Sequence, residues 1–207
     1  MQVVTSNPDE SITVEDKQNE RYAICWCALE PHRFQTGEAV NRWRKTSLSY
    51  CIANRSVGEL SPAEWDAAIE RAFDSWARVS PLRFSRTEDR FEADLLLDVT
   101  RTNWYSQETY GGLLGWAMMP RGNNFDGQLT AMFVADAFWS AGETRREKSV
   151  FLQAVMAHEI GHLLGMDHTI PQTALMYPYY RPGLVTPHDV DDIPRISELY
   201  PYSPYQD

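Results

Sequence analysis

Cysteine and positive charge are scarce in this sequence, and long hydrophobic runs are absent. The 207 residues include three cysteines, an odd number that is too small for a disulfide framework. Lysine and arginine number 19 against 29 acidic residues, and the net charge of −10 argues against nucleic acid or an anionic membrane as a partner. No stretch approaches the apolar length of a membrane span. We therefore expect neither a nucleic-acid-binding nor a membrane protein.

What remains fits one globular domain with a tail. A hydrophobic content of 43% in 207 residues is ordinary for a chain that buries a single core. The segment before about Asn41 is rich in charge and poor in periodicity. We predict a polar tail with a pro-like stretch over residues 1–41 and a folded domain over residues 42–207.

The clearest helix start is at Ser61. Serine is a good N-cap, Pro62 suits the first helical position, and Glu64 is placed to close a capping box. Apolar residues then recur at helical spacing and are expected to pack against a sheet; they are Trp65, Ala68, Ile69, Ala72, Phe73 and Trp76.

Further elements follow from apolar and β-branched content. Strands are predicted over residues 48–52, 82–85, 93–99 and 128–134, and a second long helix over residues 150–164. Mixed strands with a few helices predict an α+β domain.

The stretch from His158 to His168 carries the strongest chemical signal. His158 and His162 are four residues apart, so on a helix both rings can face one ion, with Glu159 beside them. Gly165 is a typical helix end, after which the chain can turn and bring in His168 as a third ligand. Three neutral imidazoles leave the fourth tetrahedral position of Zn²⁺ open for water. This pattern predicts a catalytic zinc site rather than a closed structural one.

The extended motif resembles that of the metzincin zinc peptidases, which pair it with a methionine turn. Residues 174–180, Ala-Leu-Met-Tyr-Pro-Tyr-Tyr, look like such a turn, and within the clan they are similar to the matrixins, the matrix metalloproteinase family. Further segments resemble the family in its order, and they are residues 42–50, 63–84, 111–117, 191–193 and 199–200.

The resemblance implies a fold and an activity. The fold is a twisted, mixed, mostly parallel sheet with an antiparallel edge strand, about three helices, an active-site helix and the methionine turn. The activity is zinc-dependent endopeptidase cleavage of proteins or peptides with one catalytic zinc ion. In this mechanism zinc activates a water molecule and Glu159 acts as general base.

The resemblance also assigns roles outside the zinc ligands. Met176 is the methionine of the turn, a packing residue beneath the metal. Tyr180 falls in the wall of the specificity pocket, although an exposed tail aromatic is the alternative. Backbone groups of Leu114 and Gly115 fall where the family pairs with an extended substrate, and pairing inside the sheet is the alternative.

Several positions depart from the family pattern. Trp116 and Met132 stand where two histidines of a second, structural zinc site are expected, so we predict that this second zinc is absent. Pro194 lies in the last predicted helix and needs a place in its first turn. Four aspartates could ligate calcium, although solvated surface carboxylates are the favoured interpretation; they are Asp94, Asp98, Asp126 and Asp136.

Cys25 and Cys27 lie upstream of the first strand at about the distance of the propeptide cysteine that keeps many matrixins latent. A thiolate is a good zinc ligand, but the flanking residues do not reproduce the family's switch motif. A latency ligand, one disulfide with a free thiol, and three free thiols all remain open.

Two classes of function remain. A zinc endopeptidase is favoured because a decayed site has no chemical reason to keep Glu159; the alternative is a non-catalytic or latent zinc-binding interaction module. We expect a monomer that acts on a protein or peptide substrate. The family resemblance implies secretion, although the start of the sequence lacks the basic and apolar regions of a signal peptide.

Overall fold

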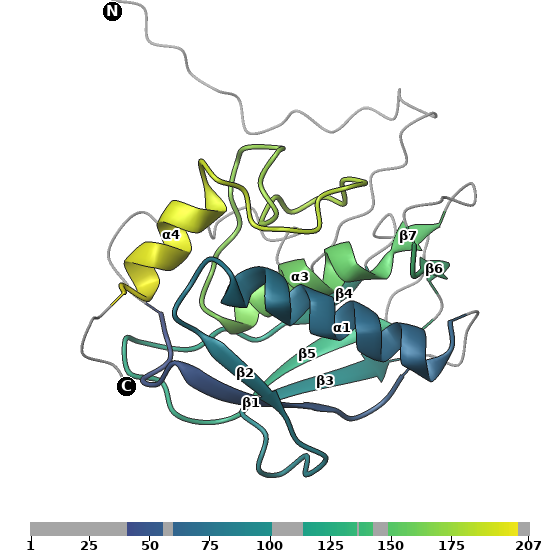
Figure 1. Cartoon of the computed structure of the whole chain (residues 1–207), viewed down its shortest axis with the longest axis horizontal. Helices are drawn as coiled ribbons and strands as arrows, with labels where there is room; N and C mark the ends of the chain where they lie inside the picture. The colour runs from purple at the N-terminus through teal and green to yellow at the C-terminus, as the bar shows by residue number, and fades with distance from the viewer. Residues whose placement is uncertain (1–40, 56–59, 101–113, 136, 143–148, 203–207) are drawn as a thin grey trace, which may run out of the picture.

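The computed structural model describes residues 41–55, 60–100, 114–135, 137–142 and 149–202. Its centre is a five-stranded sheet with the strand order β2-β1-β3-β5-β4 (Figure 1). The first four strands in this order run parallel, whereas β4 pairs antiparallel with β5 at one edge. The strand bounds are β1 (Ser47–Ile52), β2 (Arg83–Arg86), β3 (Leu95–Thr100), β4 (Gly115–Ala117) and β5 (Leu129–Val134).

The described residues form three helices and one small second sheet. Helices α1 (Pro62–Ala77) and α3 (Leu152–Leu163) lie together above the sheet in Figure 1, and α4 (Asp192–Leu199) stands apart near the end of the chain. The second sheet pairs β6 (Trp139–Ser140) with β7 (Val150–Phe151). The predicted α+β fold is confirmed, with its mostly parallel sheet and antiparallel edge strand.

Helix α1 begins as its sequence predicts. The Ser61 hydroxyl accepts a hydrogen bond from the Glu64 amide, and the Glu64 carboxylate accepts one from the Ser61 amide. The predicted apolar face is buried, and Phe73 stacks on Tyr50 of β1 with ring centroids 4.2 Å apart. The helix therefore packs its apolar stripe onto the sheet.

Helix α3 differs from the prediction at its start. Val150 and Phe151 were expected to be helical, but they form β7, and the helix begins at Leu152. The Val150 amide donates to the Phe138 carbonyl at 2.9 Å, so a tertiary pairing outweighs the continuing apolar pattern. At the other end, Gly165 adopts a φ of 96° beyond the last helical turn, as predicted.

The proline of the last helix lies where the sequence requires it. Pro194 is the third residue of α4 and so lies in its first turn, where a missing amide hydrogen is tolerated. Cys51 is buried with a free thiol, while Cys25 and Cys27 lie outside the described residues. No helix in the described part of the chain is long and apolar enough to span a membrane.

Candidate active site

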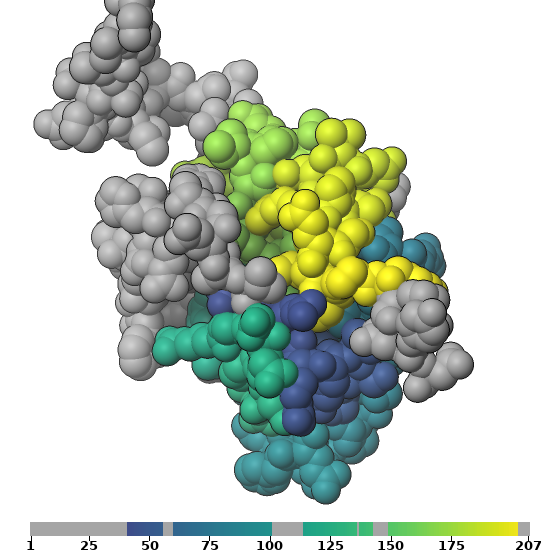
Figure 2. Space-filling model, turned by 90° about the vertical axis from the view of Figure 1, so that its left-hand side faces the viewer, coloured from purple at the N-terminus to yellow at the C-terminus, as the bar shows by residue number. Residues whose placement is uncertain are grey.

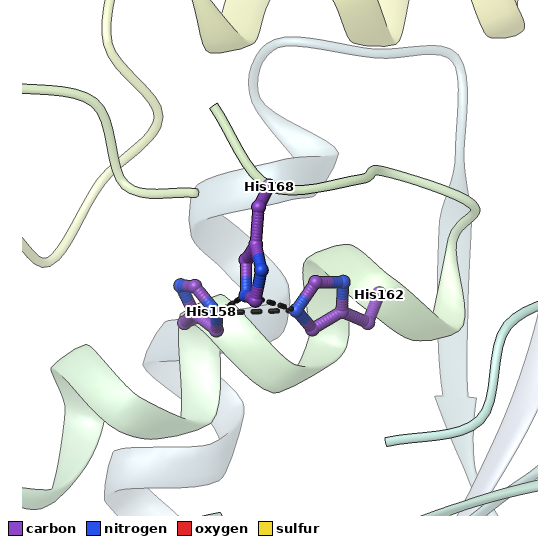
Figure 3. Close-up of side chains that lie close together, drawn as sticks. All are labelled: His158, His162 and His168. Carbon is purple, nitrogen blue, oxygen red and sulfur yellow. Dashed lines mark hydrogen bonds between the residues drawn. The ribbon is translucent and has the colours of Figure 1, made fainter. Parts of the chain in front are cut away.

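The three motif histidines converge at one point. His158 and His162 project from α3, and His168 comes from the extended segment after the helix, so that the three rings point at one another (Figure 3). The three Nε2 atoms lie 3.1–3.2 Å apart. The structure thus brings together the three residues that the sequence predicted as metal ligands.

Backbone carbonyls fix the orientation of two of these rings. The Nδ1 atom of His158 lies 2.8 Å from the Leu175 carbonyl oxygen, and that of His162 lies 2.7 Å from the Met166 carbonyl oxygen. A carbonyl oxygen only accepts, so each Nδ1 carries the proton and each Nε2 of the neutral ring keeps its lone pair. Two bare Nε2 atoms facing each other repel unless a cation lies between them.

The donor set fits zinc. Tetrahedral coordination at about 2.0–2.1 Å separates two ligand nitrogens by about 3.3 Å, close to the spacing of the Nε2 atoms. Among the described residues, these three histidines are the one group of three or more His, Cys, Asp or Glu side chains arranged to share an ion. With three protein ligands, a fourth position is left for water or substrate.

Burial keeps the imidazoles neutral. It lowers the pKa of His158 to about 4 against the opposing effect of the Leu175 carbonyl, and it lowers the pKa of His168 to about 3 with help from His158 and Arg195. Burial is also the main cause that lowers the pKa of His162. Neutral rings are the form that binds a metal ion.

Glu159 is completely buried beside these ligands. Its carboxylate oxygens have no hydrogen-bond partner within the described residues, and burial raises its pKa well above the ordinary value. It lies against β4, because a Cβ atom added to Gly115 would come within 3.3 Å of Oε1. An orphaned buried carboxylate implies a polar partner at this place, which a water molecule in the open zinc position would supply.

Met176 packs beneath the ligand-bearing helix. A Cβ atom on Gly161, which lies between the two helical ligands, would overlap the Met176 sulfur and approach Trp76 to 2.8 Å. The missing side chain at Gly161 therefore lets the methionine turn lie directly against α3. This is the packing position predicted for Met176.

The turn itself is anchored by Asp192, whose role sequence reasoning missed. The buried Asp192 carboxylate accepts hydrogen bonds from the amides of Leu175 at 2.6 Å, Met176 at 3.2 Å and His188 at 2.8 Å. Because the Leu175 carbonyl is the partner of His158, Asp192 acts on a zinc ligand through one residue. From the sequence alone, Asp192 cannot be distinguished from its neighbour Asp191 as the residue that binds the turn.

The C-terminal end of α3 bonds to residues from both ends of the described chain, Trp43 and Tyr200. Trp43 Nε1 donates to the Leu163 carbonyl at 2.8 Å, and the Tyr200 hydroxyl donates to the Leu164 carbonyl at 2.8 Å. The Trp43 amide in turn donates to the Tyr200 hydroxyl at 3.1 Å. Figure 2 shows the C-terminal residues, in yellow, lying directly against the purple segment that begins at Asn41. Free carbonyls of the helix end are thus satisfied from outside the helix.

Strand β4 offers a backbone edge near Glu159. The Leu114 carbonyl accepts from the Val134 amide at 3.0 Å, so this group pairs inside the sheet. In the antiparallel register, the neighbouring Gly115 has its amide and carbonyl directed away from β5. Of the two residues predicted to pair with a substrate, Gly115 has the geometry for it, and the Leu114 carbonyl does not.

Tyr180 lies near the N-terminal end of α3. Its hydroxyl accepts a hydrogen bond from the Phe151 amide at 2.9 Å, just before the helix begins. Tyr180 also lines a pocket of about 200 Å³, whose other lining residues are Ser140, Gly142, Ser149, Phe151, Pro182 and Gly183. The half-buried side chain therefore forms part of a pocket wall, and its role in substrate specificity stays a prediction.

The two positions that replace expected histidines face each other. Trp116 of β4 lies opposite Met132 of β5 in the register, so an apolar pair occupies this part of the sheet. Neither side chain offers an imidazole, and the absence of a second zinc ion stays a prediction.

Three of the four aspartates named as possible calcium ligands are paired with neighbouring donors. Asp94 bonds to Lys45 at 2.7 Å and to the Ser49 amide at 2.8 Å, and Asp98 accepts from the Asn54 side chain at 2.7 Å. Asp126 pairs with Arg44, and Asp136 lies outside the described residues.

Comparisons with known proteins agree with this geometry. The sequence profile of one family, Matrixin, matches residues 42–201. Karilysin of Tannerella forsythia is 36% identical over 167 residues, which are 78% of this chain and 34% of that protein. Stromelysin-2 of Rattus norvegicus is 36% identical over 180 residues (84% and 36%), and interstitial collagenase of Sus scrofa is 35% identical over 162 residues (77% and 33%). The chain thus spans about a third of the length of these relatives.

Proposed function

The chain belongs to the matrixin family, and from this premise we propose that it is a zinc-dependent endopeptidase that hydrolyses peptide bonds in proteins or peptides. The observation that carries the proposal is the open site. Three neutral imidazoles converge on one point beside a buried carboxylate that lacks a partner among the described residues. A closed structural site would need a fourth protein ligand and would have no use for Glu159.

The chemistry follows from these groups. When bound, zinc lowers the pKa of a water molecule in its open position and polarises the scissile carbonyl. Glu159, buried beside the ligands, would accept a proton from that water and pass it to the leaving amine. Burial of the site excludes bulk water and strengthens each of these interactions.

We place the substrate along β4. An extended peptide would pair with the outward backbone groups of Gly115, next to Glu159. The side chain that follows the scissile bond would lie toward the pocket walled by Tyr180, which begins about two helical turns, or about 10 Å, before His158. Phe151, Tyr180 and Pro182 in its lining would give apolar contacts to such a side chain.

The domain boundary and the N-terminal segment are further parts of the proposal. We place the catalytic domain from Arg42, where the family match begins and where Trp43 packs against α3. We keep Cys25 and Cys27 as candidate latency ligands within residues 1–41, and we propose by family membership that the protein acts outside the cell, as a monomer.

The test is cleavage of a fluorogenic peptide library by the full chain loaded with zinc. Glu159→Ala should lose at least about a hundredfold in kcat/KM while it keeps its zinc, because it removes the general base without removing a ligand. Glu70→Ala is the matched control, since Glu70 is an exposed glutamate on helix α1, and it should cleave like the parent. Equal cleavage by Glu159→Ala and the parent would refute the proposed mechanism.

Latency is tested in the same assay. Replacement of Cys25 and Cys27 together by serine should raise the rate of the full chain if a thiolate occupies the open zinc position. An unchanged rate would remove the latency assignment and leave the peptidase assignment intact. No cleavage by any variant, with zinc bound in all of them, would favour a non-catalytic zinc-binding module.

A further inference from the structure

Besides Asp192, helix α4 carries a second charged residue, Arg195, whose side chain reaches the zinc-binding segment. Arg195 lies one turn after Asp191 on this helix, and its Nη2 atom donates a hydrogen bond of 2.8 Å to the carbonyl of Asp167. Asp167 directly precedes the third ligand, His168. The guanidinium therefore binds the peptide group that carries this ligand.

The segment from Met166 to His168 serves two ligands at once. The Met166 carbonyl is the partner of the His162 ring, and His168 is itself a ligand. The segment is fixed on one side by the Met166 amide, which donates to the Gly161 carbonyl at 2.9 Å, and on the other by Thr169, whose amide donates to Met176 at 3.1 Å. Arg195 holds the peptide between these two points, where a shift would move His168 relative to the α3 ligands.

The charge of Arg195 makes a purely electrostatic role unfavourable. A guanidinium near a Zn²⁺ site repels the ion, and a protein gains nothing from this repulsion unless the side chain does something else. Asp191 offsets part of the charge through an ion pair in which Arg195 Nη1 and Asp191 Oδ2 are 3.8 Å apart. Neither of these two buried atoms has a hydrogen bond in the described part of the structure. Among the described residues, the guanidinium thus makes one hydrogen bond, the one to the Asp167 carbonyl.

We propose that Arg195 is a positioning residue that holds the Asp167 peptide so that His168 meets the zinc ion together with His158 and His162. The inference rests on the proposed zinc site, but it does not require that the protein cleaves peptides. Helix α4 would then orient two ligands. Arg195 would position His168 through Asp167, and Asp192 positions His158 through Leu175.

The test is the zinc dissociation constant of the full chain, measured by competition with a chromophoric chelator. Arg195→Gln should weaken zinc binding about 10- to 100-fold, the usual effect of losing a group that orients a ligand. Arg195→Lys should recover most of the affinity, because an ammonium group can still donate to the carbonyl. Arg83→Gln is the matched control, since Arg83 donates to the Leu82 carbonyl at 2.9 Å on β2, away from the site, and its affinity should equal that of the parent.

The melting temperature of each metal-free chain separates positioning from stability. A positioning role predicts that Arg195→Gln binds zinc more weakly than Arg83→Gln even if the two metal-free chains melt at the same temperature. Zinc affinity equal to the parent, or higher because a positive charge was removed, would overturn the inference. If Arg195→Gln does not fold, Arg195→Lys is compared with Arg195→Met, which has a long side chain without a donor: tighter zinc binding by the lysine variant supports the inference, and equal binding by the two variants contradicts it. Parent chain that binds zinc without cleaving peptides would count against the peptidase only.

Discussion

Helices α1 and α3 lie side by side on the sheet, yet their sequences specify them in different ways. Helix α1 carries its own start signal in Ser61 and Glu64 and has one buried and one solvent-facing side. Helix α3 has no side-chain cap at Phe151, and all twelve of its residues are buried. Its last carbonyls are satisfied by side chains from other parts of the chain, including Trp43 and Tyr200.

Because of this difference, the positions of His158 and His162 depend on contacts from outside α3. Two side-chain hydrogen bonds join the described parts of these helices, one from Arg71 Nε to Gln153 and one from Trp76 Nε1 to the Ala157 carbonyl, each at 2.8 Å, the second immediately before His158. Local signals suffice for a helix that only covers the sheet. The ligand-bearing helix must hold two rings to within a few tenths of an ångström, and it is held from outside by the rest of the fold. Changes around α3 should therefore alter zinc binding and stability together, while changes at the N-cap or the outer face of α1 should alter stability alone.

The largest effect is expected at the end of α3. Gly165→Ala would place a Cβ atom onto the Asn41 carbonyl at a residue with a φ of 96°, so strain and overlap add. We expect a loss of about 3 kcal/mol or more in the free energy of unfolding, measured by urea denaturation. Gly122→Ala is the control, because Gly122 also has a positive φ but has open space around it, and it should lose about 1 kcal/mol. Equal losses would show that the contact with Asn41 is unimportant.

A smaller effect is expected for one indole hydrogen bond. Trp43→Phe leaves the Leu163 carbonyl without its donor, whereas Trp65→Phe in α1 removes an indole nitrogen that has no partner among the described residues. Both substitutions remove similar volume from buried sites. Trp43→Phe should therefore cost about 1 kcal/mol more in unfolding free energy and should also weaken zinc binding. The comparison fails if Trp65→Phe is the costlier of the two.

The N-cap of α1 provides a change that should leave the site untouched. Ser61→Ala removes the hydroxyl that accepts from the Glu64 amide and should lower the unfolding free energy by about 1 kcal/mol. The zinc dissociation constant should stay at the parent value, since within the described residues the Ser61 side chain bonds only to Glu64. A parallel loss of zinc affinity would mean that α1 and α3 are not specified independently.

The smallest effect is a pH dependence on the outer face of α1. Burial alone would raise the pKa of Asp66, but hydrogen bonds from Arg55 at 2.5 Å and Arg86 at 2.8 Å outweigh it and lower the pKa below the ordinary 3.8. A carboxyl group whose pKa is lowered by folding stabilises the folded state at a pH above its pKa in the unfolded chain. This stabilisation is lost as the pH falls through the folded-state pKa. The stability difference between the parent and Asp66→Asn should therefore shrink between about pH 5 and pH 3. A difference that stays constant with pH would contradict the lowered pKa.

The sequence was sufficient where chemistry and spacing carry the information. The zinc ligands, Glu159 and the start of α1 are defined by residue type and periodicity, and each lies where the motif places it. Arg195 and Asp192 could not be found in this way, because their partners are backbone groups of Asp167, Leu175 and Met176, and a backbone acceptor or donor leaves no trace in residue type.

The same reason explains the misplaced start of α3. The apolar pattern continues through Val150 and Phe151, and only the neighbouring strand β6 decides that they pair as a strand. The inward carbonyl of Leu114 likewise follows from its register with β5, which a single strand does not reveal.

The most direct test of the central claim is the zinc stoichiometry of the full chain, measured by elemental analysis after dialysis, for the parent and for His162→Ala. We predict one zinc ion per parent chain and one fewer in His162→Ala, because His162 contributes one of three converging Nε2 atoms. A parent chain without zinc, or a His162→Ala chain that retains as much zinc as the parent, would contradict the assignment of this site.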